Sequence, residues 1–181
     1  MKRLFLALIL CLAFTGCRDS VQPAPASPAV PDSIAVYFSP NGGCTDAIVA
    51  VLGEAKQTVR IQAYSFTSAP IAKAVVEAHR RGVDVQVILD SSQRTQKYSS
   101  ADFLAHGGVP VLIDARHKIA HNKVMIIDGE VVITGSFNFS KAAEESNAEN
   151  LLVIRSRDLA AKYAANWRAH AEHSEKYVSV R

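Results

Sequence analysis

Residues 119–140 read I-A-H-N-K-V-M-I-I-D-G-E-V-V-I-T-G-S-F-N-F-S, and this stretch decides the fold. Apolar runs rich in Val and Ile flank Asp128-Gly129, which predicts two antiparallel strands joined by a tight turn. His121 and Lys123 stand two positions apart in the first run, so their side chains are expected on the same face of a strand. An imidazole and an ammonium are costly in an apolar run unless they are paired or face a cleft. This conflict between apolar pattern and polar content indicates a functional site.

Strand and helix patterns alternate along the chain outside this hairpin. Strands are predicted at residues 33–38, 59–66, 83–89, 109–113, 124–127, 131–134 and 150–155. Helices are predicted at residues 46–57, 70–81, 101–106, 141–146 and 157–173, with Thr45, Ser140 and Ser156 as caps and Trp167 in the core. This order favours a layered α/β fold, an α-β-α sandwich with a mixed, mostly parallel sheet.

The N-terminal region has the organisation of an export signal followed by a tether. Residues 1–16 hold a short basic start and an apolar run of about eleven residues, typical of a signal peptide and too short to span a bilayer. Cys17 ends a Phe-Thr-Gly-Cys sequence that resembles a bacterial lipobox, so it is the expected lipid site, with simple cleavage as the alternative. Residues 17–32 contain four prolines and predict an extended linker to a domain at 33–181. We therefore expect an exported, periplasmic protein whose only membrane attachment is this anchor.

The net charge argues against polyanion binding through overall charge, and the cysteine count argues against an intrachain disulfide. Without Lys2 and Arg3, the 20 basic residues become 18 against 17 acidic ones, a formal charge of +1. Binding of a polyanion must then come from a local patch rather than from the net charge. Cys44 is the one cysteine outside the signal and the lipid site, so no intrachain disulfide is expected. It is expected to be a small, partly buried residue, with an intermolecular disulfide as the alternative.

The polar groups of the central stretch suit a phosphoryl ligand. Ser136 and Asn138 alternate like His121 and Lys123, so all four side chains can converge on one point. Lysine supplies charge, and the amide and hydroxyl donate hydrogen bonds to phosphoryl oxygens without a metal. Histidine can act as nucleophile or as proton donor. Asp128 has the opposite parity and is expected to orient or support the site rather than touch the ligand.

The spacing His121-x-Lys123-(four residues)-Asp128, followed by Gly135-Ser136-x-Asn138, resembles the signature of the phospholipase D superfamily. Further stretches, at residues 63–67, 81–85 and 135–143, are similar to its small bacterial endonuclease branch, and the similarity extends over residues 33–177. The resemblance implies a phospholipase D/nuclease-like fold. It also implies a phosphodiesterase that works through a covalent phosphohistidine, without metal or other cofactor.

The resemblance further implies a homodimer, because such active sites need two H-x-K-D segments and this chain has one. One His121 would attack phosphorus, and His121 of the partner subunit would protonate the leaving oxygen. Lys123 and Asn138 from both subunits would bind the phosphoryl oxygens, with Ser136 assisting. Glu149 matches the family position whose carboxylate hydrogen-bonds the catalytic histidine.

Three functions follow as hypotheses. The leading one is a sequence-nonspecific endonuclease acting on DNA, with RNA left open, because contacts to backbone phosphoryl groups carry little base information. The first alternative is a phospholipase D-type hydrolase of membrane phospholipids, and the second is a nucleic-acid-binding protein without catalysis. Four basic residues either line a groove for nucleic-acid phosphates or are ordinary solvated charges: Arg94, Lys97, Arg116 and Lys118.

The remaining charged and histidine residues carry weaker signals. His79 and His106 are expected at the surface or in helix caps. His170 and His173 have the i, i+3 spacing of a metal-binding pair, but the sequence offers no further ligand, so no metal is expected. The Glu144-Glu145 pair is expected to be solvated helix charge.

Overall fold

The computed structural model describes residues 32–179. The expected signal peptide, the lipid site at Cys17 and the linker up to residue 31 lie outside the described residues. None of the helices within residues 32–179 combines the length and the apolar character that crossing a bilayer requires.

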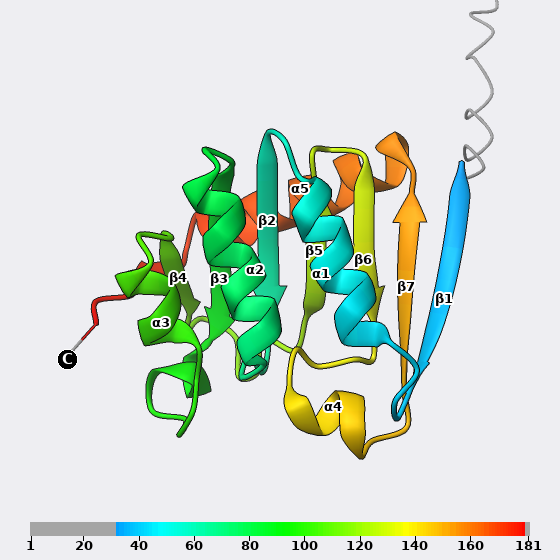
Figure 1. Cartoon of the computed structure of the whole chain (residues 1–181). Coiled ribbons are helices and arrows are strands. Elements are labelled where there is room, and N and C mark those ends of the chain that lie inside the picture. The colour runs from blue at the N-terminus through cyan, green and yellow to red at the C-terminus, as the bar shows by residue number, and fades with distance from the viewer. Residues whose placement is uncertain (1–31, 180–181) are drawn as a thin grey trace, which may run out of the picture.

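One mixed sheet of eight strands forms the centre of the described part, in the order β1-β7-β6-β5-β2-β3-β4-β8 (Figure 1). The strands are β1 (Ser33–Ser39), β2 (Thr58–Ala63), β3 (Asp84–Asp90), β4 (Val111–Asp114), β5 (Lys123–Ile127), β6 (Val131–Gly135), β7 (Glu149–Arg155) and β8 (Glu175–Lys176). Only the pairs β2–β3 and β3–β4 are parallel. The mixed sheet is confirmed, but the prediction of a mostly parallel sheet is wrong. In the centre, β5 and β6 form an antiparallel hairpin, and β2 pairs antiparallel with β5 and β7 with β6.

Helices cover both faces of this sheet, which confirms the α-β-α sandwich (Figure 1). The helices are α1 (Cys44–Glu54), α2 (Ala69–Arg80), α3 (Ala101–His106), α4 (Lys141–Glu145) and α5 (Arg157–Ala171), with a 3-10 turn at Ser91–Arg94. α1, α2 and α3 lie on the front face in Figure 1, and α5 crosses behind. α4 lies at the lower end of the sheet, between β6 and β7 in the chain.

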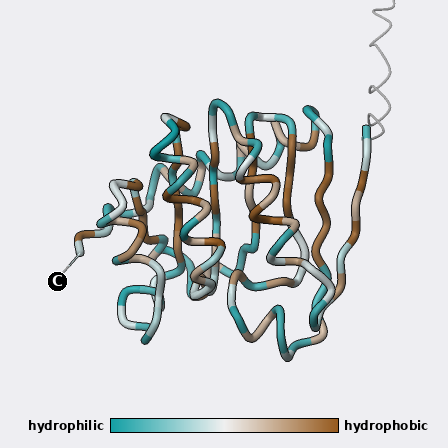
Figure 2. Tube along the Cα trace, viewed as in Figure 1, coloured by the Kyte–Doolittle hydropathy of each residue, from teal (hydrophilic) through white to brown (hydrophobic). Residues whose placement is uncertain are grey.

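Two apolar clusters hold the layers together, and in Figure 2 the hydrophobic colour follows the central strands. The larger cluster lies under α1 and α2 and contains the fully buried Ile48 and Val75. The smaller lies under α5 and contains Val132 and Trp167. Trp167 is 5% exposed and its Nε1 donates to the Ile61 carbonyl at 3.0 Å, so its expected place in the core is confirmed. Each large apolar side chain buried in this way contributes about 1.5–3 kcal/mol.

The start of α1 differs from the prediction. The helix begins at Cys44 rather than after Thr45, and the carboxylate of Glu144 accepts hydrogen bonds from the N–H groups of Gly43 (3.1 Å) and Thr45 (2.7 Å). Glu144 therefore caps α1 from α4, where its negative charge also complements the helix dipole. The expectation of a solvated Glu144 is wrong, whereas Glu145 is exposed and pairs with a lysine one turn away.

The strand expected at residues 59–66 ends early, at Ala63. The chain then turns, and Phe66 forms an isolated parallel bridge with Phe139, in the loop after β6. The Phe139 carbonyl accepts the N–H groups of both Thr67 and Ser68 at 2.9 Å. This bridge ties the loop after β2 to the loop after β6.

Candidate active site

The candidate site lies at the end of the sheet where β2 and β6 finish and β5 and β7 begin. An open pocket of about 400 Å³ is found there, lined by His121, Lys123, Gly135, Ser136, Asn138 and Glu149. The structure thus brings together five of the residues that the sequence proposed as catalytic. Asp128 is not among the lining residues.

His121 and Lys123 face each other directly. The Nζ of Lys123 lies 3.0 Å from the Nε2 of His121 and also donates to the His121 carbonyl at 3.1 Å. An ammonium group has only donors, so the Nε2 must accept. A neutral His121 ring in this contact has its proton on Nδ1, and Nε2 then offers the lone pair that a nucleophile needs.

Lys123 is a buried charge, with 7% of its surface exposed. No carboxylate lies within ion-pair distance of it among the residues that the structure describes, although the field of Glu149 reaches it. Burial lowers the pKa of the Lys123 ammonium below its ordinary value, and the charge of Glu149 opposes this shift. A buried ammonium without an ion-pair partner favours the binding of an anion.

Tyr64, to which the sequence gave no role, belongs to the site. Its ring lies 4.6 Å from the His121 ring, centroid to centroid, and the Lys123 Nζ lies 5.2 Å from its centre. Its backbone N–H donates to the Asn122 carbonyl at 2.8 Å. Tyr64 therefore orients both reactive side chains, and the signal for it was its place in the family-like stretch at residues 63–67.

Asp90, at the end of β3, was also missed. Its side chain is 3% exposed, accepts from the Ser92 N–H at 2.9 Å and accepts from the Ala120 N–H at 2.7 Å. The second bond fixes the backbone immediately before His121. Asp90 is thus a positioning residue, and a carboxylate at the end of a buried strand was its sequence signal.

The segment after β6 supplies hydrogen-bonding groups. The Ser136 Oγ accepts from the backbone N–H and from the Nδ2 of Asn150, at 3.1 and 3.3 Å. Gly135 has φ 146°, and a Cβ there would lie 2.3 Å from the Asn150 carbonyl oxygen, so only glycine fits. The Oδ1 of Asn138 is buried without a partner among the described residues. A carboxamide can turn over in place, so Asn138 can present its NH₂ group to a phosphoryl oxygen.

Glu149 lines the pocket but does not bond His121, contrary to expectation. Within residues 32–179 its Oε1 accepts from the Asn147 Nδ2 at 3.1 Å. Its backbone N–H donates to the Ser39 Oγ at 3.2 Å. The Asn147 amide thus holds the carboxylate at the pocket, within the electrostatic reach of Lys123.

Asp128 lies at the other end of β5, about 17 Å of strand away from Lys123. Its carboxylate accepts the backbone N–H groups of Lys56 (2.9 Å), Gln57 (2.7 Å) and Thr58 (2.9 Å). Burial alone would raise the pKa of Asp128, but these three hydrogen bonds hold it below its ordinary value. Its contacts fasten the hairpin to the start of β2 rather than reach the ligand pocket.

The four basic residues proposed for a phosphate groove do not gather at the pocket. Arg94 and Lys97 line a separate pocket of about 690 Å³, where Arg94 pairs with Glu175 at 2.6 Å. Arg116 and Lys118 are exposed in the connection that leads from β4 to His121.

Cys44 is fully buried at the start of α1. Burial, with help from the Glu144 charge, raises the pKa of the thiol to about 11. A buried, protonated thiol is unreactive, which disfavours the alternative of an intermolecular disulfide.

Known proteins are similar to this chain both in sequence and in fold. A family model described as "Cardiolipin synthase, PLD-like domain" matches residues 48–170. A protein named phospholipase D from Rickettsia felis is 43% identical over 134 residues, which cover 74% of this chain and 67% of that protein. A mitochondrial cardiolipin hydrolase from Mus musculus is 28% identical over 138 residues, 76% of this chain and 62% of that protein.

Solved structures agree with these matches. The phospholipase D family member Nuc from Salmonella typhimurium has a TM-score of 0.78 and 38% identity, covering 81% of this chain and 99% of that one. NucT from Helicobacter pylori has a TM-score of 0.75 and 27% identity, covering 80% and 99%. With His121 beside a buried Lys123 in the pocket, these likenesses lead to one conclusion: the chain belongs to the phospholipase D superfamily and is a phosphodiesterase.

Proposed function

We propose that the protein is an endonuclease that hydrolyses the phosphodiester bonds of DNA, and of RNA as a second polymer, without sequence specificity and without a metal in the reaction. The observation that carries this proposal is the pocket itself. A buried Lys123 ammonium and an exposed His121 lie in an open pocket whose other side chains, from Ser136, Asn138 and Glu149, are all polar. A phosphodiester in a polymer backbone can enter such a site from the side.

The first chemical step is attack by His121. Its Nε2 lone pair forms a bond to phosphorus while the bond from phosphorus to the leaving oxygen breaks. His121 of the partner subunit takes up a proton at Nε2 once its own Lys123 turns to the phosphoryl oxygens, and it donates this proton to the leaving oxygen, which departs as a hydroxyl. Lys123 releases Nε2 and donates instead to the non-bridging phosphoryl oxygens, where negative charge increases. Asn138 donates to the same oxygens through its NH₂ group.

The second step removes the phosphoryl group from His121. The partner's His121, now neutral, takes a proton from water, and the resulting hydroxide oxygen bonds to phosphorus. The phosphorus–nitrogen bond breaks and returns the electron pair to Nε2. The products are a phosphomonoester and the original pair of histidines, with one neutral ring and one protonated ring.

This scheme needs two copies of the chain, and the surface beside the pocket supports that arrangement. Ile34, Val36 and Phe38 alternate along β1 and are 54%, 50% and 65% exposed. The next residue, Ser39, pairs with Glu149 of the pocket. A second copy that covers this apolar row would bring its own His121 toward the pocket, and it would remove apolar surface from water.

Lack of sequence specificity follows from the groups available. The lining side chains are donors, charges and a carboxylate at the phosphoryl position, and such contacts position a nucleic acid without reading its bases. The exposed Arg116 and Lys118, just before His121, can add contacts to neighbouring phosphates.

A phospholipase activity is the second candidate, because several Rickettsia relatives bear the name phospholipase D. A pocket of about 540 Å³ with mostly apolar lining, including Ala69, Ala72 and Phe103, could hold an acyl chain. This pocket and the one around His121 have no lining residue in common, which makes the nuclease the better-supported function.

The proposed setting is the periplasm, with Cys17 lipidated. The test is fractionation of cells that express the full chain. Wild type is expected with membranes, and Cys17→Ala in the soluble periplasmic fraction. Recovery of both proteins in the cytoplasm would contradict export.

The deciding experiment incubates the purified protein with supercoiled plasmid in excess chelator, and in parallel with phospholipid vesicles. The assay temperature stays well below the melting temperature measured in chelator. We expect nicking and then fragmentation of the plasmid, lost in His121→Ala and retained in the control His106→Ala. Release of lipid headgroup from vesicles beside intact plasmid would favour the second candidate. Plasmid binding without turnover at any pH would favour a binding protein.

A further inference from the structure

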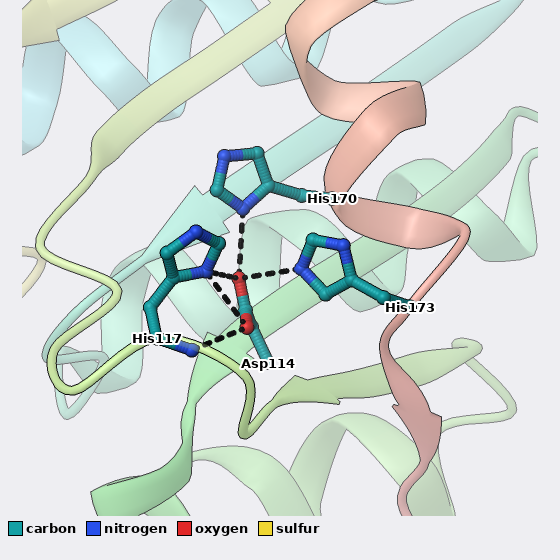
Figure 3. Close-up of side chains that lie close together, drawn as sticks. All are labelled: Asp114, His117, His170 and His173. Carbon is teal, nitrogen blue, oxygen red and sulfur yellow. Dashed lines mark hydrogen bonds and ion pairs between the residues drawn. The ribbon is translucent and has the colours of Figure 1, made fainter.

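A second cluster of chemically active side chains lies outside the pocket (Figure 3). Asp114 ends β4, and His117 follows in the connection toward His121. His170 and His173 come from the last turn of α5 and the residues after it. The sequence indicated no further ligands for His170 and His173. The fold supplies two, Asp114 and His117, from β4 and the connection after it.

The three imidazoles converge on a single carboxylate oxygen. The Oδ2 of Asp114 lies 2.7 Å from the Nδ1 of His170, 3.0 Å from the Nδ1 of His117 and 3.3 Å from the Nε2 of His173. A carboxylate oxygen has two lone pairs, so three donors exceed what it can accept. The geometry reflects this excess, because the His173 Nε2 is buried and makes no hydrogen bond with any described residue.

The distances match a coordination shell. One ligand atom from each of the four residues lies within 4.8 Å of all the others. In a tetrahedral zinc site with bonds of about 2.0–2.2 Å, neighbouring ligand atoms are about 3.3 Å apart. The nitrogen–oxygen distance of His173, 3.3 Å, already has this length, and those of His117 and His170, 3.0 and 2.7 Å, are somewhat shorter. Small side-chain rotations would bring the remaining pairs to it.

The surroundings suit a closed, structural ion site. The Asp114 side chain has no exposed surface, while the side chains of His170 and His173 are 15% and 18% exposed. The Oδ1 of Asp114 accepts from the backbone N–H of Arg116 at 3.1 Å and lies 3.2 Å from the His117 Nδ1, while Oδ2 is in reach of all three histidines. His117 is 46% exposed and gives an ion a path from solvent. Four protein ligands leave no open position for chemistry.

We propose that Asp114, His117, His170 and His173 bind one late first-row divalent metal ion, with Zn²⁺ as the best match. Three imidazoles and one carboxylate are borderline ligands that favour Zn²⁺, Co²⁺ or Ni²⁺ over the oxygen-seeking Mg²⁺ and Ca²⁺. On binding, the ligating nitrogens lose their protons and the excess of donors around Oδ2 disappears.

The ion would join parts of the chain that are far apart in sequence. It would fasten the end of α5 to the connection between β4 and β5, four residues before His121. Ala120, whose N–H donates to Asp90, lies between His117 and His121 in the chain. The site therefore stabilises the segment that carries the nucleophile, and it does not take part in the reaction.

The test uses the full chain, stripped with chelator, dialysed and titrated with Zn²⁺. We expect about one Zn²⁺ per chain by elemental analysis. At a hundredfold excess over the dissociation constant, Tm should rise by about 5–10 °C. Co²⁺ should give the visible absorption of a tetrahedral site, and Mg²⁺ should leave Tm unchanged.

His173→Asn is the decisive variant, because the His173 Nε2 has only its 3.3 Å contact with Asp114 to lose in the metal-free protein, the longest of the three. It should keep the Tm of the metal-free wild type and lose both the bound Zn²⁺ and the Tm increase. His106→Asn and His121→Ala should bind Zn²⁺ like wild type. Failure of wild type to bind Zn²⁺, or unchanged binding in the double variant His170→Asn/His173→Asn, would overturn the proposal. Neither outcome bears on plasmid cleavage, so this proposal and the nuclease can fail separately.

Discussion

The Nζ of Lys123 lies 3.0 Å from the Nε2 of His121 in a pocket where the lysine residue is 7% exposed. In the proposed mechanism, the nitrogen that attacks phosphorus and the charge that receives phosphoryl oxygens are therefore in contact before substrate arrives. The pair costs stability, because burial disfavours the Lys123 charge. Activity and stability are expected to oppose each other at this residue.

Lys123→Met tests that opposition. Removal of the ammonium should lower kcat for plasmid cleavage by about 10²–10³-fold, the loss expected for one oxyanion-stabilising donor. It should raise Tm, since a buried charge is replaced by an apolar chain of similar length. Thermal unfolding and cleavage rates would be compared with Lys73→Met, an exposed control on α2. A Tm below that of wild type would contradict the conclusion that the charge costs stability.

Mixed dimers test whether two chains share one site. Wild type and His121→Ala, carrying different tags, would be unfolded together in equal amounts and refolded. If each site needs two histidines, only one dimer in four is active, and activity per total protein should be about one quarter of wild type. Independent sites would leave about one half, so a value of one half would exclude the shared mechanism.

Asp128→Asn separates a supporting role from a chemical one. The carboxylate accepts three backbone hydrogen bonds, and the amide would weaken them. The variant should therefore be less stable by about 1–2 kcal/mol, a modest value because the bonds are partly solvated. The folded pKa is below the ordinary value, so the stabilisation is complete above about pH 4 and is lost as pH falls through the folded pKa. Denaturant unfolding at pH 3 and pH 7 measures it. Plasmid cleavage at pH 7 should stay within a few-fold of wild type, and loss comparable to His121→Ala would assign Asp128 a chemical role.

Glu144→Ala removes the cap that α4 provides to α1. The two backbone N–H groups that it leaves unpaired should lower the free energy of unfolding by about 1 kcal/mol. Glu145→Ala is the matched control, and its exposed pair with Lys141 should contribute little. Equal losses in the two variants would show that the cap adds nothing.

Cys44 predicts an alkaline decline in stability. Because its folded pKa is raised to about 11, the buried neutral thiol contributes fully below the unfolded value of 9.0 and less as pH rises. Between about pH 9 and 11, wild type should lose about 1.4 kcal/mol per pH unit relative to Cys44→Ala. Unfolding curves at several pH values measure the difference in slope, and parallel slopes would show that the thiol is not shielded.

Local patterns predicted most elements, because their boundaries are set by neighbouring residues. Residues 101–106 form α3 with the bounds expected, and Ser140 and Ser156 cap α4 and α5 through their hydroxyls. The start of α1 was misplaced because its cap, Glu144, lies about one hundred residues away. No local window contains that information.

The same distinction holds for the site. His121 and Lys123 could be predicted because they are two positions apart in one short segment, with Lys123 as the first residue of β5 and His121 just before it, and the family motif supplied Ser136, Asn138 and Glu149. Contacts between strands that are far apart in the sequence were not predicted. The pairing of Ala63 with Lys123 brings Tyr64 to the pocket, and the order β3-β4-β8 brings Asp114 to the end of α5. The first of these placements requires the register of β2 on β5, which sequence periodicity alone does not give.

The bridge between Phe66 and Phe139 has a consequence for how the pocket meets its substrate. Because the Phe139 carbonyl accepts two N–H groups from the loop after β2, the loops that carry Tyr64 and Asn138 move as one body. We therefore expect the pocket to be preorganised, without a closing step before phosphorus is attacked. Selection among substrates then depends on which phosphodiesters can reach the open pocket, and not on a lid that folds over the correct one.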